Sequence, residues 1–214
     1  QLIVPEAEMR EMVSLKDGET FSQLELTNST KRISDRLGND GYTFADVRSM
    51  PERNDADKTV KITLFVNPGQ RAYVRRINFR GNTRTADEVL RREMRQMESA
   101  SASSSKIEQS KVRLERLGYF KDVRVNNTEV PGTGDQMDVE YIVTEQPSGS
   151  IGASIGFAQG SGMILGASLQ QDNFLGTGKQ VGINASTSSY QDQLSFSYFD
   201  PYYTVDGVSR GFNV

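Results

Sequence analysis

The chain has 214 residues, with 25 Lys or Arg against 28 Asp or Glu, so its net charge is only −3. This near balance argues against a nucleic-acid binder that is held by phosphate attraction. The absence of histidine removes the commonest general base and metal ligand, and the absence of cysteine excludes disulfides and thiolate sites. No apolar run approaches the roughly 20 residues that a membrane-spanning helix needs. We therefore predict no catalytic residue, no metal and no cofactor.

The first 146 residues contain two segments that resemble each other. The offset between them is 80 residues in a helical part and 76 residues after it. Self-similarity of this kind indicates two copies of one small domain in tandem. The matched positions are Lys31 with Lys111, Leu37 with Leu117, and residues 46–48 with residues 122–124.

The first copy is predicted to hold a helix and then a hairpin. The hairpin has a turn at residues 54–57, and its second strand alternates at Val60, Ile62, Leu64 and Val66. No opening strand is visible before Pro5, so we expect this first domain to be N-terminally truncated.

The second copy shows more elements. Residues 73–79 read as a strand, and Thr85 with Glu88 forms a capping box, which predicts a helix through about Met97. The serine-rich stretch 99–105 is expected to bury little. A second helix has one face made of Ile107, Ser110, Leu114 and Leu117.

The second copy then ends in a predicted hairpin. Its strands are marked by Val123 and by an alternating run, and residues 131–135 between them have turn chemistry. The predicted order of elements is therefore β-α-α-β-β. The alternating run is Met137, Val139, Tyr141 and Val143.

Residues 147–214 differ in character from everything before them. They hold six of the 53 charged residues and 11 of the 19 glycines. Apolar and small polar residues alternate in four predicted strands, each near the ~9–11 residues of a tilted membrane strand. A soluble β-sandwich with one wet face is the alternative interpretation, although such faces usually carry Lys and Glu. Because single-chain barrels start at about eight strands, we expect the rest of the barrel to lie outside this sequence.

Four long segments resemble the BamA family of outer-membrane barrel-assembly factors. The resemblance covers essentially the whole chain. It implies an α+β fold of tandem β-α-α-β-β polypeptide-transport-associated (POTRA) domains, followed by an incomplete antiparallel transmembrane β-barrel. The implied domains are residues 1–71 (fourth POTRA), 72–146 (fifth POTRA) and 147–214 (first four barrel strands). The segments that carry the resemblance are 54–61, 91–98, 170–178 and 200–209.

The resemblance also implies a function without enzymatic chemistry. Such a protein would receive unfolded β-barrel clients in the periplasm and insert them into the Gram-negative outer membrane by strand templating. The implied partners are a lipoprotein of the BamD kind, other lipoproteins of the assembly machine, the clients and outer-membrane lipid, but no nucleic acid. In this family the segment that ends at Glu98 docks the lipoprotein, which implies contacts by Glu98 first and then by Arg91 and Arg95. The family usually has bulky apolar residues soon after this glutamate, where this chain has serines.

The same resemblance implies that the first barrel strand is a lateral gate. Such a strand would pair weakly with the last strand of the barrel, open, and offer its unpaired backbone groups to a client. Three glycines weaken a strand and favour opening. The residues of the predicted gate are Gly149, Ile151, Gly152, Ala153, Ile155, Gly156 and Phe157.

Two other functions stay open at this point. One is a related secretion porin or translocation-assembly protein, in which POTRA domains recognise one exported client. The other is a periplasmic enzyme or soluble binding protein, which the absence of His, Cys and a convergent carboxylate pair disfavours.

Overall fold

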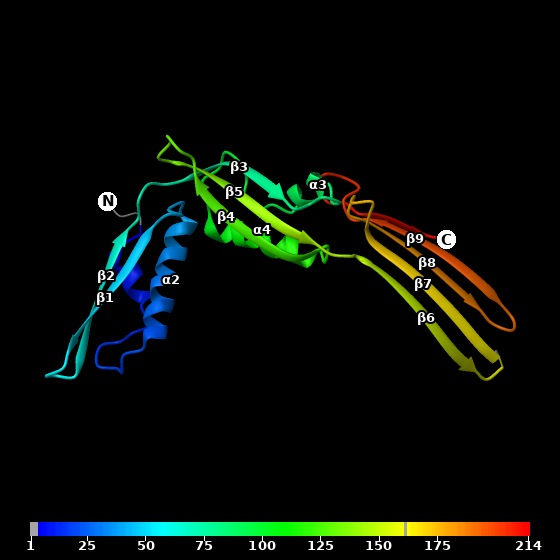
Figure 1. The fold of residues 1–214 in the computed structure, drawn as a ribbon, viewed down its shortest axis with the longest axis horizontal. Helices are drawn as coiled ribbons and strands as arrows, with labels where there is room; N and C mark the ends of the chain where they lie inside the picture. The colour runs from blue at the N-terminus through cyan, green and yellow to red at the C-terminus, as the bar shows by residue number, and fades with distance from the viewer. Residues whose placement is uncertain (1–3, 161) are drawn as a thin grey trace. The chain divides into compact units, whose positions relative to one another are not determined.

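The computed structural model describes residues 4–160 and 162–214 (Figure 1). These residues divide into two compact units. The first unit holds the described residues up to Asn78 together with Met94–Ser110 and Asn126–Glu140. The second unit holds Phe79–Glu93, Lys111–Val125 and Tyr141–Val214. The N-terminal domain therefore lies in the first unit, and the C-terminal sheet lies in the second.

The N-terminal domain packs two helices against a hairpin. Ser22 caps the long helix, because its Oγ accepts the N–H of Glu25 at 3.3 Å. The core is built from Met9, Ile33 and Leu37 with the inward residues of the hairpin. The predicted truncation concerns the residues before Pro5, of which 1–3 lie outside the described residues. The elements are α1 (Glu6–Glu11), α2 (Gln23–Asn39), β1 (Asp46–Asn54) and β2 (Thr59–Asn67).

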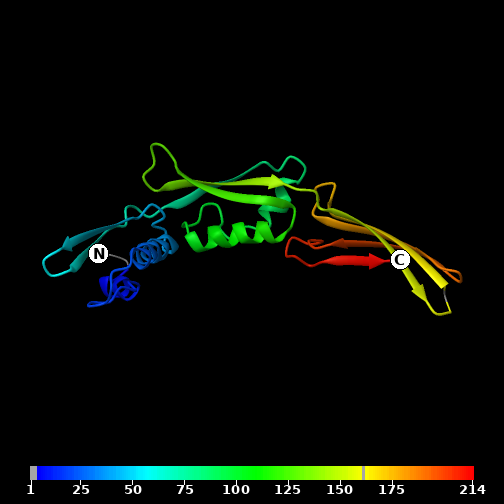
Figure 2. The same ribbon diagram turned by 60° about the horizontal axis from the view of Figure 1, so that its bottom comes forward.

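The second domain has the predicted order β-α-α-β-β. Its three strands form a sheet in the order β3-β5-β4, and Figures 1 and 2 show α4 running along one face of this sheet. The four alternating residues predicted for the last strand are all at most 3% exposed. The elements are β3 (Tyr73–Arg80), α3 (Asp87–Arg91), α4 (Ser104–Arg116), β4 (Phe120–Glu129) and β5 (Gln136–Glu145).

The two long helices confirm the repeat but correct its register. A buried serine lies in the middle of each helix and donates its hydroxyl to the carbonyl four residues earlier, from Ser29 to Glu25 and from Ser110 to Lys106, both at 2.7 Å. Each serine Oγ also accepts a backbone N–H from the preceding loop. Burial matches the helices at an offset of 81 rather than 80, because the buried positions are 26, 29 and 33 in α2 and 107, 110 and 114 in α4.

The predicted capping box is wrong, and so is the helix through Met97. Helix α3 has five residues and begins after Ala86, with no side-chain cap. The Thr85 N–H instead binds the Glu145 carboxylate at 2.7 Å. The chain leaves the helix after Arg91 because Ser110 Oγ accepts the N–H of Arg95 at 2.8 Å, which fixes a different backbone path.

The serine-rich stretch 99–105 is also ordered differently from the prediction. Its small residues let the backbone pair along the edge of β3, where the Ser99 N–H binds the Val74 carbonyl at 2.7 Å and the Ala102 N–H binds the Ala72 carbonyl at 2.9 Å. Ala102 is buried. The prediction that this stretch buries little misses Ala102, the one residue of the seven that is buried.

The C-terminal sheet is antiparallel and has the strand order β10-β9-β8-β7-β6. The sequence predicted four strands here, and the structure has β10 as a fifth, whose four residues are too few to show alternation. Ser161, in the predicted turn after the first strand, lies outside the described residues. Within the described ranges, no helix has the length and apolar character needed to cross a bilayer. The strands are β6 (Gly149–Ala158), β7 (Gly162–Phe174), β8 (Lys179–Thr187), β9 (Asp192–Asp200) and β10 (Arg210–Asn213).

Candidate functional site: the open edge of the C-terminal sheet

Strand β6 is one edge of the five-stranded sheet. It pairs with β7 over all ten of its residues, from Gly149 opposite Gln171 to Ala158 opposite Gly162. In the described part of the chain, no strand pairs with its other side. The backbone groups that point to that side form a row that is open to another strand.

The two faces of this sheet have different chemistry. On one face, Ile151, Ile155 and Phe157 are 85%, 80% and 86% exposed. Their register partners on β7 are Leu169, Leu165 and Met163, which continue the apolar face. This face therefore exposes a broad apolar surface that water does not favour.

The opposite face is built from glycine and serine. Gly152 lies opposite Ser168, and a Cβ on the glycine would come within 2.6 Å of the serine Oγ. Gly182 lies opposite Ser197 in the same way, at 2.5 Å. Serine hydroxyls thus fill the space above the glycines, and this face is polar and thin.

Strand β6 lacks the features that usually protect an edge. Charged residues and proline discourage further pairing at a free edge. Strand β6 has neither, whereas the edge strand β1 contains Pro51 and Arg48, and β4 contains Lys121 and Arg124. Among the edge strands of the described residues, β6 is the one that is long, uncharged and free of proline.

The sheet is joined to the second domain by the turn between β7 and β8. The Asn173 Nδ2 donates to Thr85 Oγ1 at 2.8 Å, and the Ala86 N–H donates to the Gly176 carbonyl at 2.9 Å. Gly176 has a φ of +74°, and a Cβ there would overlap the carbonyl oxygen of Arg84. Only glycine fits this approach, because both the backbone conformation and the contact exclude a side chain.

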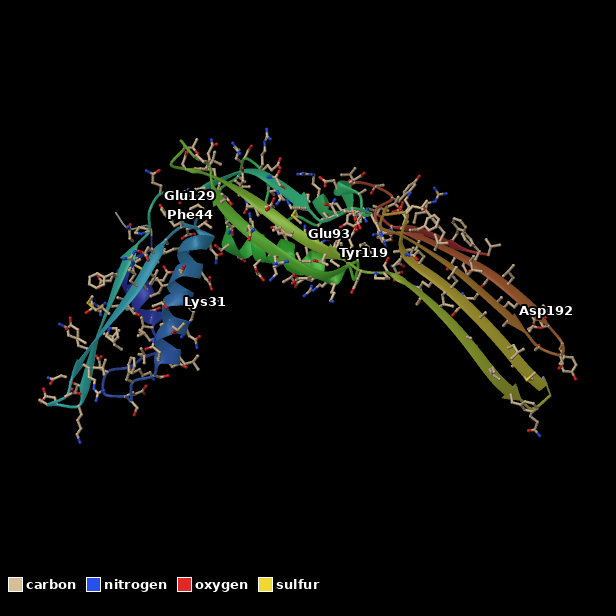
Figure 3. The ribbon with its side chains drawn as sticks, viewed as in Figure 1. Lys31, Phe44, Glu93, Tyr119, Glu129 and Asp192 are labelled. Carbon is tan, nitrogen blue, oxygen red and sulfur yellow. The ribbon has the colours of Figure 1, made fainter. Side chains whose placement is uncertain are left out.

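A second turn, after β9, meets the same domain through Tyr202. The guanidinium of Arg92 lies 4.3 Å from the centre of the Tyr202 ring. Arg113 donates to the Tyr202 hydroxyl at 3.3 Å and pairs with Glu93 at 2.6 Å. The Glu93 side chain is only 5% exposed, whereas the Arg113 side chain is 31% exposed, so the carboxylate is buried and the guanidinium keeps some contact with water. Figure 3 labels Glu93 and Tyr119 in this part of the second domain.

The C-terminal sheet meets the second domain at these two turns, and we call this region the joint. Two titratable groups at the joint have shifted pKa values. Burial raises the pKa of Tyr119, so its phenol stays protonated and donates to the Gly178 carbonyl at 3.4 Å. Burial alone would raise the pKa of Glu145, but hydrogen bonds from Thr85, Thr83 and Arg84 outweigh it and lower the pKa. The Glu145 carboxylate thereby holds the loop that receives the turn.

The three residues predicted to bind a lipoprotein are exposed. Glu98 and Arg95 belong to the first unit and Arg91 to the second. The Glu98 Oε1 accepts the Ile77 N–H at 2.8 Å, and Arg91 lies over the Phe79 ring at 5.2 Å. Glu98 thus also covers a backbone group of β3, a role that the sequence did not predict.

Several residues of the joint were missed by sequence reasoning. Glu93, Arg113 and Tyr202 come from three separate segments, and no spacing in the sequence connects them. Glu93, Asn173 and Tyr202 each lie in a segment that carried the family resemblance, which was the only available signal, and Arg113 lies in none of them. Among the residues that the structure describes, His, Cys, Asp and Glu side chains form no group of three that could hold a metal ion.

Comparison with known proteins identifies the family. The POTRA family, described as "Surface antigen variable number repeat", matches residues 1–69 and 72–146, and the Omp85 superfamily domain matches residues 173–214. The chain belongs to the POTRA family, with the start of an Omp85 domain behind its two repeats. This confirms the predicted fold class of tandem POTRA domains followed by an incomplete antiparallel barrel.

The individual relatives are assembly factors. The chain is 40% identical over 211 residues to outer membrane protein assembly factor BamA of Neisseria meningitidis serogroup B, covering 99% of this chain and 26% of that protein. It therefore spans about a quarter of that relative's length. A crystal structure of BamA from Haemophilus ducreyi lacking POTRA domains 1-3 matches with a TM-score of 0.82 and 42% identity, over 96% of this chain and 39% of that one. A crystal structure of Haemophilus influenzae BamA POTRA3-5 matches with a TM-score of 0.63 and 40% identity, over 65% of this chain and 55% of that one. The resemblance to the BamA family is thus confirmed.

Proposed function

We propose that this chain is part of an outer-membrane protein assembly factor, which folds and inserts unfolded β-barrel clients by templating their strands. The observation that carries the proposal is the open edge of β6, which is long, uncharged and free of proline. An incoming strand gains main-chain hydrogen bonds along such an edge, and alternate side chains continue the two faces. The names of the 40% identical relative and of the two matched structures support the same function.

The proposed location is the Gram-negative outer membrane, with the POTRA domains in the periplasm. The exposed apolar face of the C-terminal sheet suits hydrocarbon, and the charged surface of the two POTRA domains suits water. Burial of apolar strand faces in lipid supplies the driving force, so the protein needs no catalytic group or cofactor.

We assign the domains as residues 1–71 for the fourth POTRA, 72–146 for the fifth and 147–214 for the start of the barrel. The support is the match to a structure that lacks POTRA domains 1-3, which covers 96% of this chain.

Cysteine cross-linking in the full-length protein tests the templating proposal. A cysteine in place of Ser154 on β6 should form a disulfide with a cysteine in a strand of an unfolded client during assembly. The control is a cysteine in place of Ser195 on β9, which has a paired strand on both sides and a residue of the same type. Equal cross-linking from both positions, or none from Ser154, would contradict the proposal.

The proposed partner is a lipoprotein of the BamD kind that contacts Glu98, Arg95 and Arg91. Glu98→Lys should reduce recovery of the lipoprotein in a pull-down, because it reverses a charge at the interface. Because this change also removes the acceptor for Ile77, Glu98→Gln serves as a second variant that keeps an acceptor oxygen and removes the charge. Glu129→Lys, an exposed change elsewhere in the domain, is the control. Undiminished recovery with both Glu98 variants would refute the contact.

A related secretion porin or translocation-assembly protein is the second candidate, because it would use the same POTRA domains. Such a protein would bind one exported client, whereas an assembly factor should cross-link to several unrelated clients through β6.

A further inference from the structure

The base of β6 is fastened to the second domain just before the strand begins. The Gln146 N–H donates to the Tyr119 carbonyl at 3.0 Å, and its Nε2 donates to the Gly118 carbonyl at 2.9 Å. Both bonds lie within the second unit of the structure. The start of β6 is therefore held to the loop between α4 and β4.

The end of β7 is fastened to the same domain at a different loop. The Asn173 side chain donates to Thr85 Oγ1 and also accepts the Gly178 N–H, both at 2.8 Å. The β7–β8 pairing shifts register between Gln171 and Phe174, and Asn173 has a φ of +56°. The chain thus leaves the regular ladder at the point where it binds the domain.

A compact set of hydrogen bonds ties these two fastened ends to each other. Ser148 Oγ donates to the Asp172 carbonyl at 2.6 Å, and the Asp172 N–H donates to the Ser148 carbonyl at 2.9 Å. Gln171 Nε2 donates to Ser148 Oγ at 3.1 Å and to the Asp172 carbonyl at 2.9 Å. We call Gln146, Ser148, Gln171, Asp172 and Asn173 the register clamp.

Beyond the clamp, the side chains of β6 and β7 specify their register weakly. In the observed register Ser154 lies opposite Gly166 and Ile155 lies opposite Leu165. A slip of two residues would place Ser154 opposite Ser168 and Ile155 opposite Ala167. Both faces would keep their character after such a slip. Glycine-rich strands of this kind are prone to alternative pairing.

We propose that the register clamp, anchored to the second domain, fixes the register of β6 against β7. The Ser148 and Gln171 side chains are its positioning residues. The free edge of β6 then presents the same backbone groups at the same height to every incoming strand. The consequence for templating rests on the proposed function, whereas the fixed register does not.

The test is disulfide trapping in the full-length membrane protein, into which cysteines can be placed because this chain contains none. The pair Ser154→Cys with Gly166→Cys reports the observed register. The pair Ser154→Cys with Ser168→Cys reports a slip of two residues. Each pair is made in the unaltered protein, in Ser148→Ala with Gln171→Ala, and in the control Ser150→Ala with Gln193→Ala. The control removes a serine and a glutamine from the same sheet whose side chains take no part in the hydrogen bonds of the clamp.

The unaltered protein and the control should trap the observed register and leave the slipped pair at background. The clamp variant should raise the slipped pair by about tenfold, because two side chains' hydrogen bonds are lost. When Ser148→Thr replaces Ser148→Ala in the clamp variant, the hydroxyl is kept, and the observed register should be restored.

A clamp variant that traps only the observed register would overturn the proposal. If the double variant does not accumulate, Ser148→Ala alone carries the same comparison, and an unchanged slipped pair there is equally decisive. No client is needed for this measurement. A failure of β6 cysteines to reach a client strand would therefore count against the proposed function and leave the register result intact.

Discussion

Strands β5 and β6 follow each other in the chain and show nearly the same alternation of apolar residues, yet their apolar sides meet different surroundings. In β5 the alternating residues Met137, Val139 and Tyr141 are fully buried. In β6, Ile151 and Ile155 are at least 80% exposed. Alternation therefore identifies one apolar face of a strand, but it does not say what covers that face.

The residues between the apolar ones distinguish the two strands. In β5 they include Asp138 and Glu140, as expected for a strand whose other face meets water. In β6 they are glycine and serine only, and the strand is also left open at its edge. We attribute this difference to two covers, namely a protein core for β5 and lipid for β6.

The largest effect should come from removing a buried leucine of the second domain. Leu114 is 0% exposed, whereas Leu194 of the C-terminal sheet is 74% exposed. Leu114→Ala should lower the free energy of unfolding of the POTRA region by about 2–5 kcal/mol through the cavity that it leaves. Leu194→Ala should change it by less than about 0.5 kcal/mol. Pulse proteolysis in urea, with the protein in detergent, measures the free energy of unfolding of both variants. Equal losses in the two variants would contradict the difference between a buried and an exposed apolar face.

The next effect should come from a charge on the apolar face of β6. Ile155→Arg should cost about 2–4 kcal/mol in the bilayer, because it places a guanidinium in hydrocarbon. Ser154→Arg, one residue away on the opposite face, should be tolerated. Folding into lipid vesicles, followed by heat-dependent gel mobility, compares the two variants. Similar folding of both would show that lipid does not cover the Ile155 face.

A smaller effect should come from the turn that joins the sheet to the second domain. Gly176 and Gly132 both have positive φ, but a Cβ on Gly132 would meet nothing within 4 Å. Both alanine variants bear the cost of the left-handed backbone. Gly176→Ala should cost about 1–3 kcal/mol more, because its Cβ overlaps the Arg84 carbonyl. Faster hydrogen exchange at the Ala86 N–H in Gly176→Ala alone is the expected result, and equal exchange in both variants would argue against the close approach.

The smallest effect should be a pH dependence from Glu145, whose pKa is lowered in the folded protein. A lowered folded pKa stabilises the protein above the unfolded pKa of about 4.3, and this stability is lost as the pH falls through the folded value. Glu145→Gln should therefore cost about 1 kcal/mol at pH 7. The deficit should shrink below about pH 4. Urea unfolding at pH 7 and below about pH 4 measures this loss of stability. A loss that is the same at the two pH values would rule out the Glu145 charge as its origin.

Much of the fold could be predicted because local patterns reported it. The helix face of Ile107, Ser110 and Leu114 and the alternation in β5 follow from helix and strand periodicity. The short helix α3 could not be predicted, because its end depends on Ser110 binding the N–H of Arg95 from 15 residues away. The capping pattern at Thr85 was overridden by Glu145, which is distant in sequence.

The candidate site also has one part that the sequence could predict and another part that it could not. Strand β6 could be predicted, because its alternation is local and the structure has it at the edge of the sheet. Its role as a gate comes from the family resemblance and stays a prediction. The joint could not, since Glu93, Arg113 and Tyr202 meet only after folding. The register clamp was also missed, because Ser148 and Gln171 are polar residues without any special spacing in the sequence.

We propose that β6 works as an edge that must be free to accept a strand. The most direct measurement locks β6 by a disulfide to the last strand of the full-length barrel and follows the insertion of a client. Insertion should stop in the locked protein and return when the disulfide is reduced. Normal insertion in the locked protein would contradict this proposal.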